Sequence, residues 1–260
     1  MRENDVSGSQ PATRAPRLYV FSGAGLSAES GVPTFRSADG VWAKFDMDEV
    51  CNFKRWRRHR SAVFRFYADR RREIEAARPN GAHRLLALWQ HTWGTDRVRL
   101  ITQNVDDLLE RAGARDVVHL HGDLASLHCT DCGHRFAAPA VTLDESVACP
   151  ACGGLEGVKP GVVMFFEPAP MYARLDEMEE EISDTDLFVV VGTAFEVITP
   201  DRILPADRFN RHPRNILVDP APKRTEFFGL VEELGATTGL HRIAHIVSAV
   251  MNQKTVPDLA

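Results

Sequence analysis

The chain has 260 residues, of which 44% are hydrophobic and 26% are charged, a composition typical of a globular protein. Its longest apolar runs, such as 187–191, are far too short to cross a bilayer, so no membrane span is expected. The formal net charge of −5 does not favour nucleic-acid binding over the whole surface. This length permits one large domain, or a large domain with a smaller one.

Residues 1–16 are polar, contain two prolines and show no periodicity, which predicts a disordered tail. They also lack the apolar segment of a secretory signal, so a cytoplasmic location is expected.

A glycine-rich turn follows the first apolar run, 18–21. Gly23, Gly25 and Ala28 match the spacing G-x-G-x-x-G/A, which lets backbone N–H groups approach a pyrophosphate. By itself, the match is equally compatible with a tight strand-to-helix turn that binds nothing. Gly31 and Pro33 interrupt the helix that should follow, and no strand ends in an acidic residue about 20 positions on. An ordinary dehydrogenase is therefore not indicated.

Further apolar runs of strand length end in polar or glycine-containing clusters, at 98–101, 117–120, 187–191 and 216–218. Fully apolar strands separated by helical stretches predict a parallel sheet covered on both faces, a Rossmann-like α/β domain. Ligands bind beyond the carboxyl ends of such strands, so the polar clusters should meet at one edge.

Helical patterns occupy the intervals at 82–89, 105–111, 171–182 and 239–251. Asn104 is expected to cap the second of these helices. Two segments interrupt the sheet pattern and predict a smaller domain, made of a helical module at 46–79 and a zinc-binding module at 126–159. The sheet domain then comprises 17–45, 80–125 and 160–260.

Four of the five cysteines form two C-x-x-C pairs, Cys129/Cys132 and Cys149/Cys152, separated by 16 residues. In a reducing compartment this spacing predicts one zinc ion held by four thiolates, which is a structural site because no coordination position stays open. A zinc ribbon can also dock nucleic acid or protein, but this segment has few basic residues.

Several motifs in this order resemble the sirtuins, the NAD-dependent protein-lysine deacylases. The resemblance rests on GAGLS at 23–27, GVPTFR at 31–36, TQNVD at 102–106, HLHG at 119–122, the cysteine pairs, and GT at 192–193. It extends over nearly the whole chain. It implies NAD as co-substrate, acyl-lysine proteins as substrates, and a site between the two domains. A monomer is expected.

The resemblance also implies residue roles. Catalysis would use His121 as the base, with Asn104 and Asp106. NAD would contact these two and Gly23, Ala24, Gly25, Ser27, Phe35, Arg36, Gln103, Gly192, Thr193, Asp219 and Ala236. The acyl oxygen would attack the anomeric carbon and nicotinamide would leave. His121 would then take a proton from a ribose hydroxyl, which attacks the acyl carbon. From the residues alone, His119 and His121 are equal candidates for the base.

Tyr67 and Arg70 lie three apart on a predicted helix and resemble the acidic-acyl signature of the desuccinylase and demalonylase type of sirtuin. A guanidinium and a phenol suit the distal carboxylate of succinyl- or malonyl-lysine. Solvated surface charge is the plainer interpretation of Arg70. Cys51 falls where that type has a small alanine.

Val162 and Phe165 match the strand that pairs with the substrate peptide. Four positions depart from the family pattern: Met164 lies where an aromatic residue is usual, Phe166 replaces a glycine, Ala194 a serine, and Leu217 an asparagine that contacts the adenosine ribose. The alternatives are an NAD glycohydrolase or ADP-ribosyltransferase that uses the same site, or a non-catalytic module that binds NAD or a partner.

Overall fold

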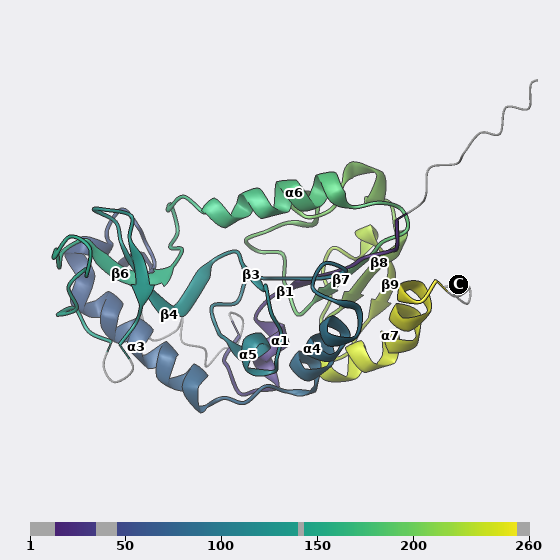
Figure 1. The fold of residues 1–260 in the computed structure, drawn as a ribbon, viewed down its shortest axis with the longest axis horizontal. Helices are drawn as coiled ribbons and strands as arrows, with labels where there is room; N and C mark the ends of the chain where they lie inside the picture. Colours follow the sequence, from purple (N-terminus) through teal and green to yellow (C-terminus); the bar gives the residue numbers. More distant parts are fainter. Residues whose placement is uncertain (1–13, 35–45, 140–142, 254–260) are drawn as a thin grey trace, which may run out of the picture.

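The computed structural model describes residues 14–34, 46–139 and 143–253, and two sheets organise this part of the chain (Figure 1). The larger sheet has six strands in the order β3-β2-β1-β7-β8-β9. The smaller, antiparallel sheet has three strands in the order β5-β4-β6. This architecture confirms the predicted α/β class, a Rossmann-like sheet accompanied by a second, smaller unit.

The strands of the larger sheet all run parallel. They are β1 (Leu18–Ser22), β2 (Val98–Thr102), β3 (Val118–His119), β7 (Leu187–Val191), β8 (His212–Val218) and β9 (Phe228–Glu232). Strands β1, β2, β7 and β8 contain the apolar runs found in the sequence, and β3 covers only the middle two residues of the run at 117–120. The edge strand β9 was not predicted, because its residues are only partly apolar and several stay half-exposed.

Helices cover both faces of this sheet, as Figure 1 shows. On one face, α4 (Gly81–Trp93), α5 (Leu108–Arg111) and α7 (Ala236–Met251) pack on side chains such as Val20. On the other face, α6 (Ala173–Glu181) packs on side chains such as Phe21. Alternate residues of one strand therefore serve two separate apolar cores.

The helix predicted over 105–111 begins only at Leu108, and the expectation that Asn104 caps it is wrong. The Asn104 amide instead donates to Ser27 Oγ at 3.2 Å. The Asp106 carboxylate accepts from the Leu108 N–H at 3.2 Å, so a side-chain turn replaces the first helical turn. The helices predicted over 82–89 and 239–251 lie within α4 and α7, and the one over 171–182 is a 3₁₀ turn, Pro170–Tyr172, followed by α6.

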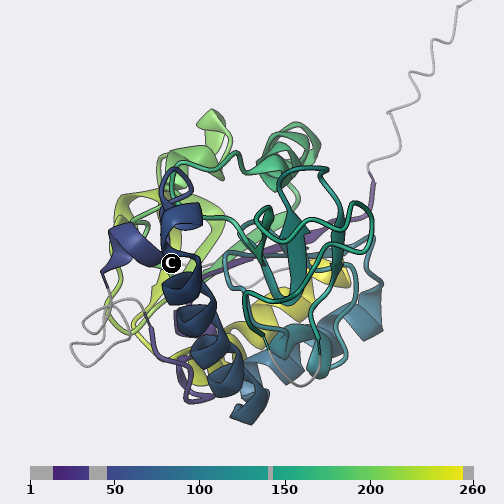
Figure 2. The ribbon, with the colours of Figure 1, turned by 90° about the vertical axis from the view of Figure 1, so that its left-hand side faces the viewer.

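The smaller unit has its own apolar core. It combines β4 (Gly122–Cys129), β5 (Arg135–Ala137) and β6 (Val158–Val162) with α2 (Met47–Val50), the 3₁₀ helix Trp56–His59, and α3 (Arg60–Ala76). Figure 2 shows α3 running alongside the antiparallel strands. The domain boundaries placed after 125 and before 160 stay a prediction, and both fall inside strands of this small sheet.

The tail predicted over 1–16 lies outside the described residues as far as position 13. Arg14 is held to the larger unit, since its Nη1 donates to Asp186 Oδ1 at 2.9 Å. Among the helices of the described ranges, none is long and apolar enough to cross a membrane.

Candidate active site and metal centre

One cleft of about 800 Å³ lies between the two units at the carboxyl ends of β1, β2 and β7. Every described residue that the sequence predicted to bind cofactor or substrate, or to act in catalysis, lines it: Gly23, Ala24, Gly25, Ser27, Tyr67, Arg70, Gln103, Asn104, Asp106, His121, Val162, Phe165, Gly192, Thr193, Asp219 and Ala236. Phe35 and Arg36 lie outside the described residues. The predicted convergence at one sheet edge is thus present.

The floor of the cleft is made by the turns that follow β1 and β7. The Gly25 N–H donates to the Gly192 carbonyl at 2.9 Å. A Cβ atom on Gly25 would lie 2.5 Å from the Gly192 Cα, so only glycine fits there. Gly192 itself has a φ of +61°, in the left-handed region. Close backbone packing is thus one reason for the glycines of this turn, in addition to any ligand.

His121 presents one basic nitrogen to the cleft. Its Nδ1 lies 3.0 Å from the Gln103 carbonyl, which can only accept, so Nδ1 carries the proton. Its Nε2 then accepts from the Tyr172 hydroxyl at 2.9 Å. Burial lowers the pKa of His121, which favours the neutral imidazole that a general base requires.

Ser27 connects several polar side chains beneath the cleft. Its hydroxyl donates to Asp106 Oδ2 at 2.8 Å and accepts from Asn104 Nδ2 at 3.2 Å and His83 Nε2 at 3.4 Å. One donated and two accepted hydrogen bonds satisfy the Ser27 hydroxyl fully. Burial raises the pKa of Asp106, and the Ser27 hydrogen bond opposes that change.

His121 lines the cleft and His119 does not, so the structure distinguishes the two candidate bases. The Nδ1 of His119 lies 2.8 Å from the Asn104 carbonyl and its Nε2 lies 2.9 Å from Glu110 Oε1. Burial alone would lower the pKa of His119, but hydrogen bonding to Glu110 and the charge of that carboxylate raise it overall. The protonated ring can donate to both acceptors, so it ties the Asn104 backbone to α5.

At the other end of the cleft, Tyr67 and Arg70 point inward from α3. The Tyr67 hydroxyl lies 3.2 Å from Cys51 Sγ. Arg70 forms an ion pair with Glu73 one turn along the helix, while its buried Nε has no hydrogen-bond partner among the described residues. Burial lowers the pKa of Arg70. Arg70 is therefore not a freely solvated surface charge.

Two of the residues that depart from the family pattern occupy very different places. Phe166 is 67% exposed at the cleft mouth, with a φ of +66° and the Lys54 ammonium 4.8 Å from its ring. Leu217 is fully buried in the core beneath α6 and does not line the cleft. At the end of β8, Val218 and Asp219 line the cleft instead of Leu217.

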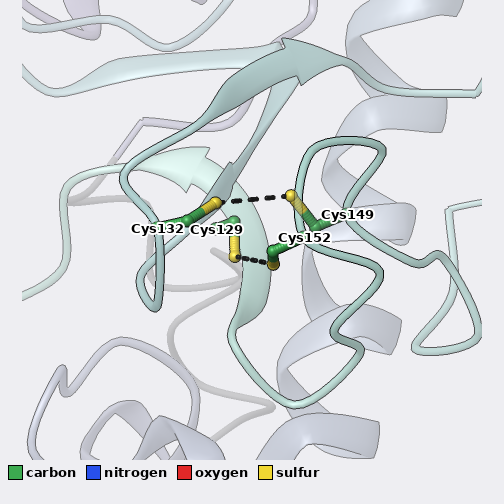
Figure 3. Close-up of side chains that lie close together, drawn as sticks. All are labelled: Cys129, Cys132, Cys149 and Cys152. Atoms are coloured by element: carbon green, nitrogen blue, oxygen red, sulfur yellow. Dashed lines mark hydrogen bonds between the residues drawn. The ribbon is translucent and has the colours of Figure 1, made fainter.

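The four paired cysteines gather in the smaller unit, and their sulfurs all lie within 4.8 Å of one another. Figure 3 shows Cys132 facing Cys149 and Cys129 facing Cys152. The sulfur–sulfur distances are 3.6 Å in the first pair and 3.7 Å in the second. Tetrahedral Zn–S bonds of about 2.3 Å would place sulfurs about 3.8 Å apart, so this donor set fits one zinc ion. A closed set of four thiolates supplies a cross-link and no open position for chemistry.

Sequence reasoning assigned no role to three residues of the cleft region: His83, Glu73 and Tyr172. For His83 a clue was available, since the stretch from Asn80 to His83 has capping-box spacing, and the structure contains that box. Glu73 lies one helical turn from Arg70, which also could have been noticed. No local pattern connects Tyr172 with His121, 51 residues earlier.

Loss of one thiolate should release the metal. We expect one zinc per native chain. Cys132→Ser should lose it, with a fall in the free energy of unfolding of at least about 3 kcal/mol, because the site's binding energy is folding energy. Atomic emission spectroscopy of the purified protein measures the zinc content, and denaturant unfolding measures the free energy of unfolding. Cys51→Ala is the control and should keep the zinc. A Cys132→Ser chain that retains one tightly bound zinc would contradict the assignment.

The buried His83 should make stability fall in weak acid. Burial lowers its pKa from 6.5 to about 4, so the folded state holds the neutral ring while the unfolded chain takes up a proton. The stabilising contribution is complete above pH 6.5 and lost as the pH falls toward 4, on the order of 3 kcal/mol in all. Unfolding measured across this range should show a shallower pH dependence in His83→Asn. Identical slopes would refute the effect.

The sequence of this chain is similar to one protein family and to several of its members. A model of the Sir2 family matches residues 23–199. An NAD-dependent protein deacylase of Helicobacter hepaticus is 41% identical over 203 residues, which cover 73% of this chain and 79% of the relative. The NAD-dependent protein deacylase Sir2 of Mycolicibacterium smegmatis is 42% identical over 197 residues, 73% of this chain and 78% of the relative.

The fold is also similar to solved structures of Sir2 homologues. A complex of a Sir2 homologue with NAD matches with a TM-score of 0.74 at 33% identity, over 90% of both chains. A histidine mutant of a Sir2 homologue, in complex with ADP-ribose, matches with a TM-score of 0.76 at 32% identity, over 92% of this chain and 94% of the other. The family model spans well over half of the chain, and the fold, the cleft and the cysteine cluster agree with it: the chain belongs to the Sir2 family, the sirtuins.

Proposed function

We propose that this protein removes acyl groups from lysine side chains of proteins, consuming NAD and releasing nicotinamide and O-acyl-ADP-ribose. One observation carries the proposal: a single cleft brings the glycine turn, the buried Asp106 carboxylate and the neutral His121 imidazole together. The names of the relatives, NAD-dependent protein deacylases, support the same activity.

The residues present fit NAD. The cleft volume of about 800 Å³ lies in the range of ligand cavities, and Gly23 and Gly25 leave its floor free of side chains. The Asp106 carboxylate, held by Ser27, suits an amide donor such as the nicotinamide carboxamide. When bound, NAD supplies the ribose hydroxyl that carries the acyl group away. His121 holds the proton of that hydroxyl at Nε2, and Gln103 keeps the ring in the required tautomer.

The protein substrate would enter beside Val162 and Phe165, where the chain leaves β6. The Phe165 N–H donates to the Cys51 carbonyl at 2.8 Å and its carbonyl accepts from Phe53 at 3.0 Å, so one edge of this segment is already paired. On the opposite edge, the Met164 N–H donates to Glu167 Oε2 at 2.8 Å and the Met164 carbonyl accepts from the Glu167 N–H at 3.1 Å. A substrate peptide that pairs with this edge would therefore have to replace these two contacts. The cytoplasmic location and the monomeric state stay predictions from the sequence.

The activity is tested by mass spectrometry with NAD and acyl-lysine peptides. The native protein should release free lysine peptide and O-acyl-ADP-ribose, and His121→Ala should lower this rate by at least about 100-fold, because the proton acceptor is lost. His241→Ala, at an exposed position on the outside of α7, should change nothing. Nicotinamide release that needs no acyl peptide would instead indicate an NAD glycohydrolase.

We further propose that the preferred acyl groups are succinyl and malonyl. Arg70 supports this, because a partly buried guanidinium with an unpartnered Nε offers a donor to a second carboxylate while Glu73 occupies another. Tyr67 lies on the same side of α3 and lines the same cleft. The Cys51 side chain beside it is small, which leaves room for a longer acyl chain.

Acyl preference is measured as kcat/KM on matched peptides, where succinyl should exceed acetyl. Arg70→Met should lower the succinyl value about 10- to 100-fold, the loss of a charge-assisted hydrogen bond, and leave the acetyl value within about threefold. Arg72→Met is the matched control on the same helix, since its side chain is 75% exposed. An equal or higher acetyl rate in the native protein, or no selective loss in Arg70→Met, would exclude the preference.

A further inference from the structure

Tyr172 contacts the only basic atom of His121. Because Nδ1 of His121 donates to the Gln103 carbonyl, the lone pair of Nε2 is the one place where the ring can take up a proton. The Tyr172 hydroxyl lies 2.9 Å from that nitrogen and donates to it. Any hydroxyl that gives its proton to His121 must therefore either displace this phenol or act through it.

Several contacts restrain Tyr172. It ends the 3₁₀ turn Pro170–Tyr172, and its N–H donates to the Ala169 carbonyl at 3.0 Å. Pro168 and Pro170 restrict the backbone just before it. The ring packs against the apolar core beneath α6. A phenol held in this way is positioned to stay on the base when substrate arrives, which favours action through it over displacement.

The phenol has the properties of a proton carrier. Burial raises its pKa, so the hydroxyl stays neutral and is a donor and an acceptor at once. Tyr172 lines the same cleft as the base. Among the described residues, His121 is its hydrogen-bond partner, and the oxygen retains lone pairs that can accept from a hydroxyl in the cleft.

We propose that Tyr172 is a further catalytic residue, whose hydroxyl passes the proton of the ribose hydroxyl to Nε2 of His121. The inference rests on the proposed deacylase activity. The ribose O–H bond breaks as its proton bonds to the phenol oxygen, and the phenol's own proton bonds to Nε2. The ribose oxygen keeps its electron pair for attack on the acyl carbon. Tyr172 ends neutral and His121 ends as an imidazolium, so atoms and charges balance.

Tyr172→Phe keeps the ring and removes only the hydroxyl. The relay serves the second half of the reaction, so the two halves should separate. Exchange of labelled nicotinamide into NAD, measured with the acyl peptide present, should stay within about threefold of native. Formation of O-acyl-ADP-ribose should fall on the order of 100-fold, the usual loss when a proton-transfer group is removed. Tyr19→Phe is the matched control, because Tyr19 loses the same atom from the core beneath α6, away from the cleft.

A second measurement counts protons. In mixtures of light and heavy water, the native acyl-transfer rate should depend on deuterium content with the curvature of two protons in motion, and Tyr172→Phe should give the straight line of one. Unchanged or faster product formation in Tyr172→Phe would overturn the relay and show that the substrate hydroxyl displaces the phenol from His121. Equal loss of both half-reactions would overturn it too, since the residue would then only support the fold. A native protein without acyl-dependent nicotinamide release would instead defeat the proposed function itself.

Discussion

The cleft depends on how closely two backbone turns approach each other. The turn after β1 and the turn after β7 meet through the hydrogen bond between Gly25 and Gly192, and a Cβ on Gly23 would lie 2.8 Å from the Gly192 carbonyl oxygen. This contact aligns the carboxyl ends of the two central strands. The strands on either side then deliver Gln103 and Asp219 to the same edge. A side chain at Gly23 or Gly25 would push the two turns apart, and the floor of the cleft would lose its present shape.

Three histidines near this floor have three different proton affinities, and each environment explains its own. His83 is buried with an N–H donor facing Nδ1, so its ring stays neutral. His121 is buried against a carbonyl and a phenol, and its pKa is lowered. His119 faces a carboxylate, and its pKa is raised. Residue type alone could not distinguish the base, His121, from the other two histidines. The hydrogen-bond partner of each ring nitrogen does distinguish them.

Much of the fold could be read from the sequence, because the central strands are uniformly apolar and the cysteine spacing constrains one ion. The strands β4 and β9 were not apparent, since β4 mixes Asp123, Ser126 and His128 with apolar residues and β9 lies at an edge. The start of α5 could not be read either, since the Asp106 side chain competes with the helix for a backbone donor. The Tyr172 contact depends wholly on how distant segments pack.

The strand β4 starts one residue after His121 and ends at Cys129, so only the seven residues 122–128 separate the base from the metal cluster. The His121 carbonyl also accepts from Val163 at 2.8 Å, where the chain returns from the second pair of cysteines. His121 and the cysteine cluster are thus attached to the same antiparallel pair of strands, β4 and β6. By thermodynamic linkage, if bound metal changes the affinity of the cleft for a ligand by some factor, that ligand changes the affinity of the cysteines for the metal by the same factor.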